Sequence, residues 1–68
     1  MRKMVKRAAG LDVHKDQVTA CVRIAGKGGE EGREEIHEFG TTTRELLALR
    51  DWLAAHRVEL VVMEATGV

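Results

Sequence analysis

The chain has 68 residues, of which 44% are hydrophobic, and a formal net charge of zero. This length allows one small domain or part of one, and a domain of about 60 residues buries only about 60% of its unfolded surface. Cys21 is the single cysteine, which excludes an internal disulfide and a paired-cysteine zinc site. The sequence contains no run of about 20 apolar residues and no signal-peptide core, so we expect a soluble, cytoplasmic protein with no membrane partner.

Charge is unevenly distributed along the chain. Residues 1–29 carry seven basic and two acidic side chains, whereas residues 30–68 carry four basic and nine acidic ones. The basic excess is concentrated in an arm at residues 1–7, with Arg2, Lys3, Lys6 and Arg7. Such an arm could contact the phosphates of DNA. A solvated terminus explains the same pattern, and charge alone favours that reading.

Two strands are expected before a glycine-rich loop. The first covers the short apolar stretch from Ala8 to Val13, and the second runs from Gln17 to Ala25, where apolar β-branched residues alternate with polar ones. The three residues between them are few enough for an antiparallel hairpin. Residues 26–32 contain four glycines and predict a flexible hairpin loop. This loop lacks the G-K-[ST] ending of a phosphate-binding loop.

A third strand, a helix and a last strand are expected after the loop. Glu34 to Phe39 forms the third strand, in which Ile36 and Phe39 are out of phase, so either a bulge or an edge position is expected. Thr42 and Glu45 match a capping box, and leucines at helical spacing predict a helix from about Thr43 to His56. The apolar run Leu60–Met63 predicts a strand buried on both faces, in parallel pairing.

The order of these elements defines the expected fold class. Strand, strand, strand, helix, strand is an α/β arrangement with a mixed sheet, because a crossover helix returns the chain parallel to an earlier strand. If the last strand lies beside the first, the carboxyl ends of both strands meet at the same edge of the sheet. The side chains at those two ends are therefore the first candidates for a site.

Asp12 and Glu64 are the candidate catalytic and metal-binding residues. Asp12 interrupts the apolar run of the first strand, and Glu64 follows four apolar residues at the end of the last strand. Two carboxylates held close together repel each other, and a divalent cation such as Mg²⁺ or Mn²⁺ removes that conflict. Two such ions about 4 Å apart would stabilise the attacking and leaving oxygens in phosphodiester chemistry. The alternative is that both acids are strand-end residues that face water, and spacing alone favours that alternative.

Three neighbouring residues are weaker candidates. Lys15 could bind a DNA phosphate beside the acidic site. His14 could approach the metal, although a solvent-exposed hairpin corner explains it better. Thr66 could contact nucleic acid where the chain leaves the last strand, but turn chemistry with Gly67 is the simpler explanation.

The motifs around these residues resemble a known family. Gly10-Leu11-Asp12-Val13-His14-Lys15, then Phe39-Gly40-Thr41-Thr42, then Met63-Glu64-Ala65-Thr66-Gly67-Val68, are similar to the N-terminal region of insertion-sequence-110-type transposases. The resemblance covers about Gly10 to Val68, in the right order. Either the first or the last motif alone would be a weak signal, whereas together they are specific.

The resemblance implies a fold and an activity. Its catalytic core is similar to that of the Holliday-junction resolvase RuvC, so residues 1–68 would be the N-terminal fragment of an RNase H-like domain. The family's acidic set is Asp, Glu, Asp, Asp; Asp12 matches the first acid and Glu64 the second. The implied function is metal-dependent DNA strand cleavage and transfer during transposition, with Mg²⁺ or Mn²⁺ as cofactor. DNA would be its partner in the nucleoid of a bacterium or archaeon, and the resemblance adds a guide-type RNA as a second partner.

The resemblance also implies that this chain is incomplete. The last two aspartates of the acidic set and the family's second domain, with its proposed serine nucleophile, have no counterpart in these 68 residues. We therefore expect this polypeptide alone to be inactive and to lack half of its metal shell. An uncovered sheet edge invites pairing with another chain, so we also expect self-association.

Two other functions remain open from the sequence. A fragment of an actin-type or sugar-kinase ATPase would share the order of elements and an early Asp, but its phosphate-binding hairpin is normally rich in Gly and Thr. Here that hairpin is Val13-His14-Lys15-Asp16. A non-enzymatic interaction module, in which the acids are incidental, is the other alternative.

Overall fold

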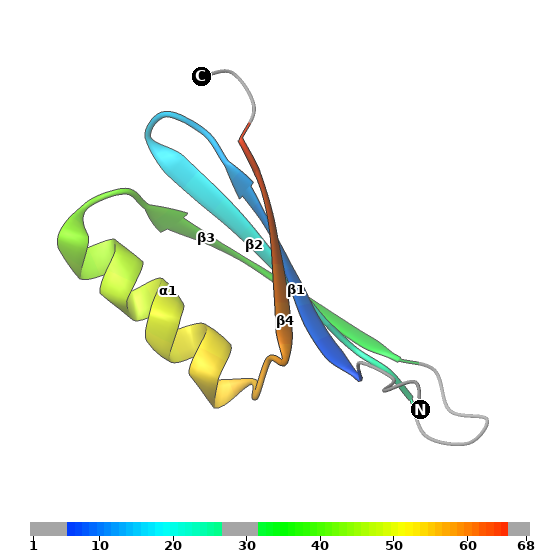
Figure 1. Cartoon of the computed structure of the whole chain (residues 1–68). Helices are drawn as coiled ribbons and strands as arrows, with labels where there is room; N and C mark the ends of the chain where they lie inside the picture. Colours follow the sequence, from blue (N-terminus) through cyan, green and yellow to red (C-terminus); the bar gives the residue numbers. More distant parts are fainter. Residues whose placement is uncertain (1–5, 27–31, 66–68) are drawn as a thin grey trace.

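The computed structural model describes residues 6–26 and 32–65. They form four strands and one helix: β1 is Arg7–Val13, β2 is Gln17–Ile24, β3 is Arg33–Gly40, α1 is Thr43–Ala55 and β4 is Leu60–Ala65 (Figure 1). The sheet order is β3-β2-β1-β4, with β1 antiparallel to β2, β2 antiparallel to β3, and β4 parallel to β1. The expected α/β fold with a mixed sheet is confirmed, and the last strand lies beside the first, which is the condition under which the two candidate acids meet.

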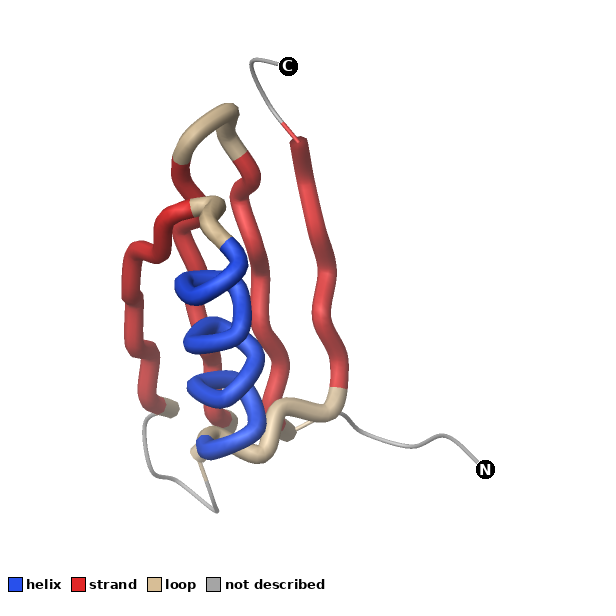
Figure 2. The backbone as a smooth tube through the Cα atoms, turned by 90° about the vertical axis from the view of Figure 1, so that its left-hand side faces the viewer, coloured by secondary structure: helices blue, strands red, loops and turns tan. Residues whose placement is uncertain are grey.

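Alternation in β2 determines which face of the sheet is covered. Val18, Ala20 and Val22 are buried, while the residues between them point to the opposite face. The helix α1 lies on the face that carries the buried residues, and the other face has no described element over it (Figure 2). The core on the covered face brings together five buried residues from three strands and the helix: Leu11, Val18, Ala20, Phe39 and Leu49. We call the opposite side of the sheet the open face.

The ends of α1 are formed by local hydrogen bonds. At the start, the Thr42 side-chain oxygen accepts a hydrogen bond from the backbone N–H of Glu45 at 3.3 Å, as the capping motif predicts. At the end, the N–H of Val58 donates to the carbonyl oxygen of Leu53 at 3.3 Å, and the N–H of Arg57 donates to that of Ala54 at 3.0 Å. This pair of bonds is the Schellman arrangement, which requires a left-handed residue just after the helix. Arg57 occupies that position with φ of 53°.

Replacing Arg57 with glycine is expected to stabilise the fold. A non-glycine residue in the left-handed region carries a steric penalty that glycine avoids. Arg57→Gly should therefore raise the free energy of unfolding by about 0.5–1 kcal/mol, measured by urea denaturation. Arg57→Ala serves as the control, since it removes the same side chain and keeps the steric penalty. Equal stability of the two variants would contradict the explanation.

Two expectations about the outer strands are settled by the structure. The prediction that the last strand is buried on both faces is wrong: every residue of β4 is exposed, because β4 is an edge strand and α1 contacts β3 instead. Its parallel pairing was predicted correctly. The phase problem of Ile36 and Phe39 is resolved by an edge position, since β3 pairs with β2 in unbroken register. Phe39 points into the core, and Ile36 lies on the open face, 63% exposed.

Some predicted features fall outside the described residues. These are the contacts of Arg2 and Lys3, positions 27–31 of the expected hairpin loop, and Thr66. The basic arm was expected to extend through residue 7, but Arg7 is the first residue of β1.

The C-terminal end of α1 is attached to the sheet through His56. Its Nδ1 lies 2.8 Å from the carbonyl oxygen of Trp52, and its Nε2 contacts a carboxylate oxygen of Glu35 on β3. Both ring nitrogens face acceptors, which favours the imidazolium form, in which both nitrogens carry protons. The backbone hydrogen bond to Trp52, followed by the bond to Glu35, raises the pKa of His56 above its usual value of 6.5. In addition, the guanidinium of Arg7 donates to the His56 carbonyl oxygen at 2.9 Å.

This arrangement predicts that the stability of the fold decreases as the pH rises. A raised folded-state pKa contributes stability that is fully present below the unfolded pKa and is lost as the pH rises through the folded pKa. The difference in unfolding free energy between the wild type and His56→Gln should therefore be larger at about pH 5.5 than at about pH 8.5. Chemical denaturation at both pH values measures it. A difference that is constant, or larger at alkaline pH, would mean that His56 does not stabilise the fold as a cation.

Candidate functional site: a carboxylate pair on the open face

The two candidate carboxylates lie directly opposite each other on neighbouring strands. Asp12 of β1 and Glu64 of β4 are Cα partners in the parallel register. Neighbouring strands are about 4.8 Å apart, and paired residues point to the same face of the sheet. Because Leu11 points into the core, Asp12 and Glu64 both belong to the open face. The convergence of the two acids that was predicted from strand order is therefore present in the backbone register.

The same level of the open face carries two further polar residues. Thr19 of β2 is opposite Asp12, and Glu38 of β3 is opposite Thr19. The row across the sheet is therefore Glu38, Thr19, Asp12, Glu64. Sequence reasoning missed Thr19 and Glu38 as neighbours of the site, although the alternation in β2 and a fixed hairpin register would have placed them there. Three carboxylates on one row make this end of the open face acidic.

His14 contacts the candidate site through Asp12. Its Nε2 lies 3.2 Å from a carboxylate oxygen of Asp12, and both side chains are about half exposed, at 48% and 50%. His14 follows the last residue of β1, and its backbone N–H donates to the Gln17 carbonyl oxygen at 2.8 Å, which closes the hairpin. The sequence favoured a solvent-exposed corner for His14. The structure places it at that corner and also against Asp12.

The predicted nucleic-acid contacts divide between the two ends of the sheet. Lys15 is exposed in the hairpin beside Asp12. Lys6 and Arg7 lie at the opposite end, where β1 begins. The Arg7 guanidinium donates a hydrogen bond to the backbone carbonyl oxygen of His56, at the end of α1. Of the described basic candidates, Lys15 is therefore the one that adjoins the carboxylate pair.

A shallow depression on the open face borders the two carboxylates. Its floor is formed by the middle of β1 and its walls by β2 and β4; the lining residues are Gly10, Leu11, Asp12, Thr19, Cys21, Val62 and Glu64. A Cβ added to Gly10 would meet no atom within 4 Å, so the floor is open to solvent at that point. The depression is apolar toward Val62 and acidic toward Glu64.

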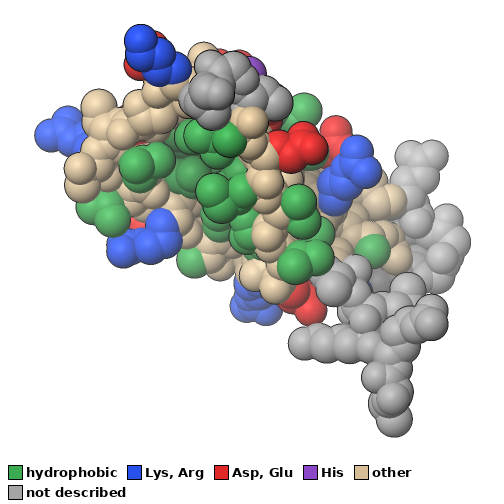
Figure 3. All heavy atoms as spheres, turned by 45° about the horizontal axis from the view of Figure 1, so that its top comes forward, with side chains coloured by type: hydrophobic (Ala, Val, Ile, Leu, Met, Phe, Trp, Pro, Cys, Tyr) green, Lys and Arg blue, Asp and Glu red, His purple; other side chains and the backbone are tan. Residues whose placement is uncertain are grey.

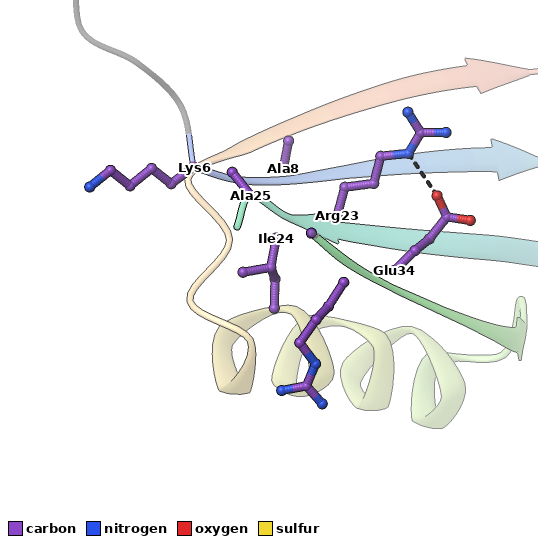
Figure 4. A pocket seen from close by; sticks show the side chains of 8 residues that line it. Lys6, Ala8, Arg23, Ile24, Ala25 and Glu34 are labelled. Carbon is purple, nitrogen blue, oxygen red and sulfur yellow. Dashed lines mark hydrogen bonds and ion pairs between the residues drawn. The ribbon is translucent and has the colours of Figure 1, made fainter. Parts of the chain in front are cut away.

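A larger pocket lies at the other end of the sheet and is lined in part by basic residues (Figure 4). Arg23 donates to a carboxylate oxygen of Glu34 at 2.9 Å, so its charge is already paired. Figure 4 shows the Lys6 side chain directed away from Arg23. Arg33 pairs with Ile24, the residue after Arg23, so it belongs to the other face of the sheet. Among the described residues, these cations therefore do not converge on a common point.

Metal chemistry can be judged from the donor set. Within residues 6–26 and 32–65, no three or more His, Cys, Asp and Glu side chains form a group that could hold a metal ion. Mg²⁺, however, is usually held by one or two carboxylates and retains several waters. Asp12 and Glu64 fit that smaller set, since they are adjacent, partly or fully exposed and supply oxygen ligands. The pair could therefore contribute one side of a cation site.

Comparisons with known proteins leave the chain without an assigned relative. No protein-family model matches it, and searches of curated proteins and of solved structures give no significant match. The thirteen residues of α1 are too few to cross a bilayer, and the described segments hold no other candidate for a membrane-spanning helix.

Proposed function

We propose that this chain is the N-terminal part of the RNase H-like catalytic domain of a metal-dependent DNA transposase or recombinase. The observation that carries the proposal is the pairing of Asp12 with Glu64 across the parallel β1–β4 register. Strand order and register are fixed by the backbone, and they bring together the two acids that the family resemblance designates.

The fold supports the same proposal. An RNase H-like core that begins with three antiparallel strands, a crossover helix and a strand parallel to the first has the order seen here. The hairpin after Asp12 is short and contains no glycine, which disfavours the ATPase alternative, whose phosphate-binding hairpin is normally glycine-rich.

The proposed roles follow from what each side chain can do. Asp12 and Glu64 hold one side of a Mg²⁺ or Mn²⁺ site. Such an ion, when bound, stabilises the charge that develops on phosphate oxygens during strand cleavage. His14 contacts the carboxylate of Asp12 and restricts its orientation. Lys15, on the adjoining hairpin, supplies a positive charge for the DNA backbone.

Two carboxylates make an incomplete acidic set for this chemistry. Further acids therefore complete the metal shell. DNA is the partner, and a guide-type RNA is a second partner that the family resemblance adds. The chain alone is expected to bind DNA weakly and to cleave it not at all.

DNA binding with and without Mg²⁺ tests the proposal. Fluorescence anisotropy of a labelled four-way junction and of a duplex should show binding that Mg²⁺ strengthens. Asp12→Asn should remove the Mg²⁺ effect, and Lys15→Ala should weaken binding in both conditions. Binding that is independent of Mg²⁺ and unchanged in both variants would favour the interaction module instead. Further aspartates encoded beyond Val68 in the same reading frame would support the transposase, and a stop codon there would favour a remnant or a module.

A further inference from the structure

The carboxylate of Asp12 has a described neighbour on each of three sides. Glu64 of β4 and Thr19 of β2 are its cross-strand partners, and His14 of the hairpin places its Nε2 3.2 Å from Oδ2 of Asp12. An ionised carboxylate accepts about four hydrogen bonds through its two oxygens. The contact with His14 uses part of this capacity, so the group on the β2 side influences which way the carboxylate turns.

Thr19 supplies a donor in a row that otherwise consists of acceptors. The ionised side chains of Glu38, Asp12 and Glu64 accept hydrogen bonds and donate none. Thr19 carries the only hydroxyl among the described residues that line the depression beside the carboxylate pair. Figure 3 turns the hairpin end of the molecule toward the viewer and shows acidic side chains, in red, beside hydrophobic ones, in green, at the surface. Thr19 is therefore the direct cross-strand neighbour that can donate a hydrogen bond to Asp12.

The backbone register places this hydroxyl near two acids. At the hairpin, the N–H of His14 donates to the carbonyl oxygen of Gln17. Because hydrogen-bonded pairs recur at every second position of an antiparallel ladder, Asp12 and Thr19 also form such a pair, with Cα atoms about 5.5 Å apart. Thr19 then faces Glu38 in the closer, non-hydrogen-bonded kind of pair, about 4.5 Å apart. Distance alone therefore does not assign the hydroxyl to Asp12.

Burial and mobility favour Asp12 over Glu38 as the acceptor. Glu38 is exposed and has one more rotatable bond than aspartate, so fixing its side chain costs more conformational entropy. The Asp12 side chain is 50% exposed, and its contact with His14 already restricts it. A partly buried acceptor also loses more free energy without a donor than an acceptor that water reaches freely. The hydroxyl of Thr19 therefore stabilises the protein more when it donates to Asp12.

We propose that Thr19 is a positioning residue for the cation site. Its hydroxyl donates to the Asp12 carboxylate from the β2 side, so that the oxygen on the β4 side is directed toward Glu64. The inference rests on the proposed function, because it concerns the same cation site. It does not depend on what lies beyond either edge of the sheet, since β1 and β2 both have neighbouring strands on each side. Groups that hydrogen-bond a metal ligand fix its orientation, and their loss typically lowers metal affinity by about 10–100-fold.

Mn²⁺ binding by the full chain and by two Thr19 variants tests the positioning role. Thr19→Val keeps the β-branched shape and removes the donor, whereas Thr19→Ser keeps the hydroxyl and is the matched control. Paramagnetic broadening in an NMR titration gives the apparent Kd, which should be at least about tenfold higher in Thr19→Val than in the wild type. Thr19→Ser should stay within about threefold of the wild type. A Thr19→Val protein that binds Mn²⁺ like the wild type, or a Thr19→Ser protein as weak as Thr19→Val, would overturn the inference.

Asp12→Asn separates the failure of this inference from the failure of the proposed function. If Asp12→Asn weakens Mn²⁺ binding and Thr19→Val does not, the cation site exists and Thr19 does not position it. If the wild type gives no Mn²⁺ response, the cation site of the proposed function is contradicted, and the positioning role with it.

Double-mutant cycles without metal identify the acceptor of the Thr19 hydroxyl. Urea denaturation measures the effect of Thr19→Val on the unfolding equilibrium constant in the wild type, in Asp12→Ala and in Glu38→Ala. This effect should differ by about threefold or more between the wild-type and Asp12→Ala backgrounds. It should be the same in the wild-type and Glu38→Ala backgrounds. Coupling to Glu38 in place of Asp12, or to neither acid, would also overturn the inference.

Discussion

Leu49→Ala is expected to unfold this domain. Leu49 is the one buried residue of α1, 7% exposed, and it packs in the core with residues of β1, β2 and β3. Truncation of a buried leucine to alanine costs about 2–5 kcal/mol, because apolar contact is lost and a cavity remains. A single core in a chain of 68 residues rarely supplies more than about 3–5 kcal/mol. The loss is therefore comparable to the whole stability of the fold.

Leu47→Ala is the matched control for this prediction. It lies on the same helix, two positions earlier, and is 46% exposed. We expect it to lower the free energy of unfolding by less than about 1 kcal/mol, as is usual for surface substitutions. Thermal denaturation followed by circular dichroism compares the two variants. A Leu49→Ala protein as stable as Leu47→Ala would mean that α1 does not pack on the sheet through Leu49.

Neutralising Glu64 is expected to have opposite effects on stability with and without a divalent cation. Without the cation, Asp12 and Glu64 face each other as like charges, so Glu64→Gln should raise the free energy of unfolding by about 0.2–1 kcal/mol. With Mg²⁺ or Mn²⁺, the wild type should become more stable as the metal concentration rises above its Kd. Both Asp12→Asn and Glu64→Gln should lower the apparent metal affinity at least about tenfold.

The melting temperature of each protein, measured over a range of Mn²⁺ concentrations, separates these effects. Glu38→Gln is the control, since Glu38 is an acid on the same row of the open face but lies on β3, two strands from Asp12. It should retain the metal response of the wild type. A loss of stability in Glu64→Gln without metal, or an equal Mn²⁺ response in all three variants, would indicate that the acids have a structural or solvated role.

Local patterns predicted the elements of this fold well. The alternation of Val18, Ala20 and Val22 determined β2 and its buried face, and the Thr42–Glu45 capping motif determined where α1 begins. Both signals arise from residues that are neighbours in sequence, so they can be recognised without knowing what packs against them. The parallel return of β4 followed from the order of the elements, whereas its place beside β1 entered only as a condition.

What the sequence did not predict depends on which elements cover which surface. The apolar run Leu60–Met63 has the composition of a strand buried on both faces, yet in β4 these residues are exposed because no described element lies over them. Composition indicates which side chains a segment could bury, but the elements that pack against the segment determine which of them are buried. The same limit applies to His14 and Thr19, whose proximity to Asp12 depends on the hairpin register and not on their own residue types.

Site-resolved NMR during a Mn²⁺ titration tests the central claim, that Asp12 and Glu64 form one side of a cation site. We expect paramagnetic broadening centred on Asp12, Glu64 and the adjoining hairpin. The broadening should be retained in Glu38→Gln and lost in both Asp12→Asn and Glu64→Gln. Broadening spread evenly over the exposed acids of a folded sample, or none at all, would contradict it. In that case the facing positions of the two carboxylates in the β1–β4 register would carry no metal chemistry.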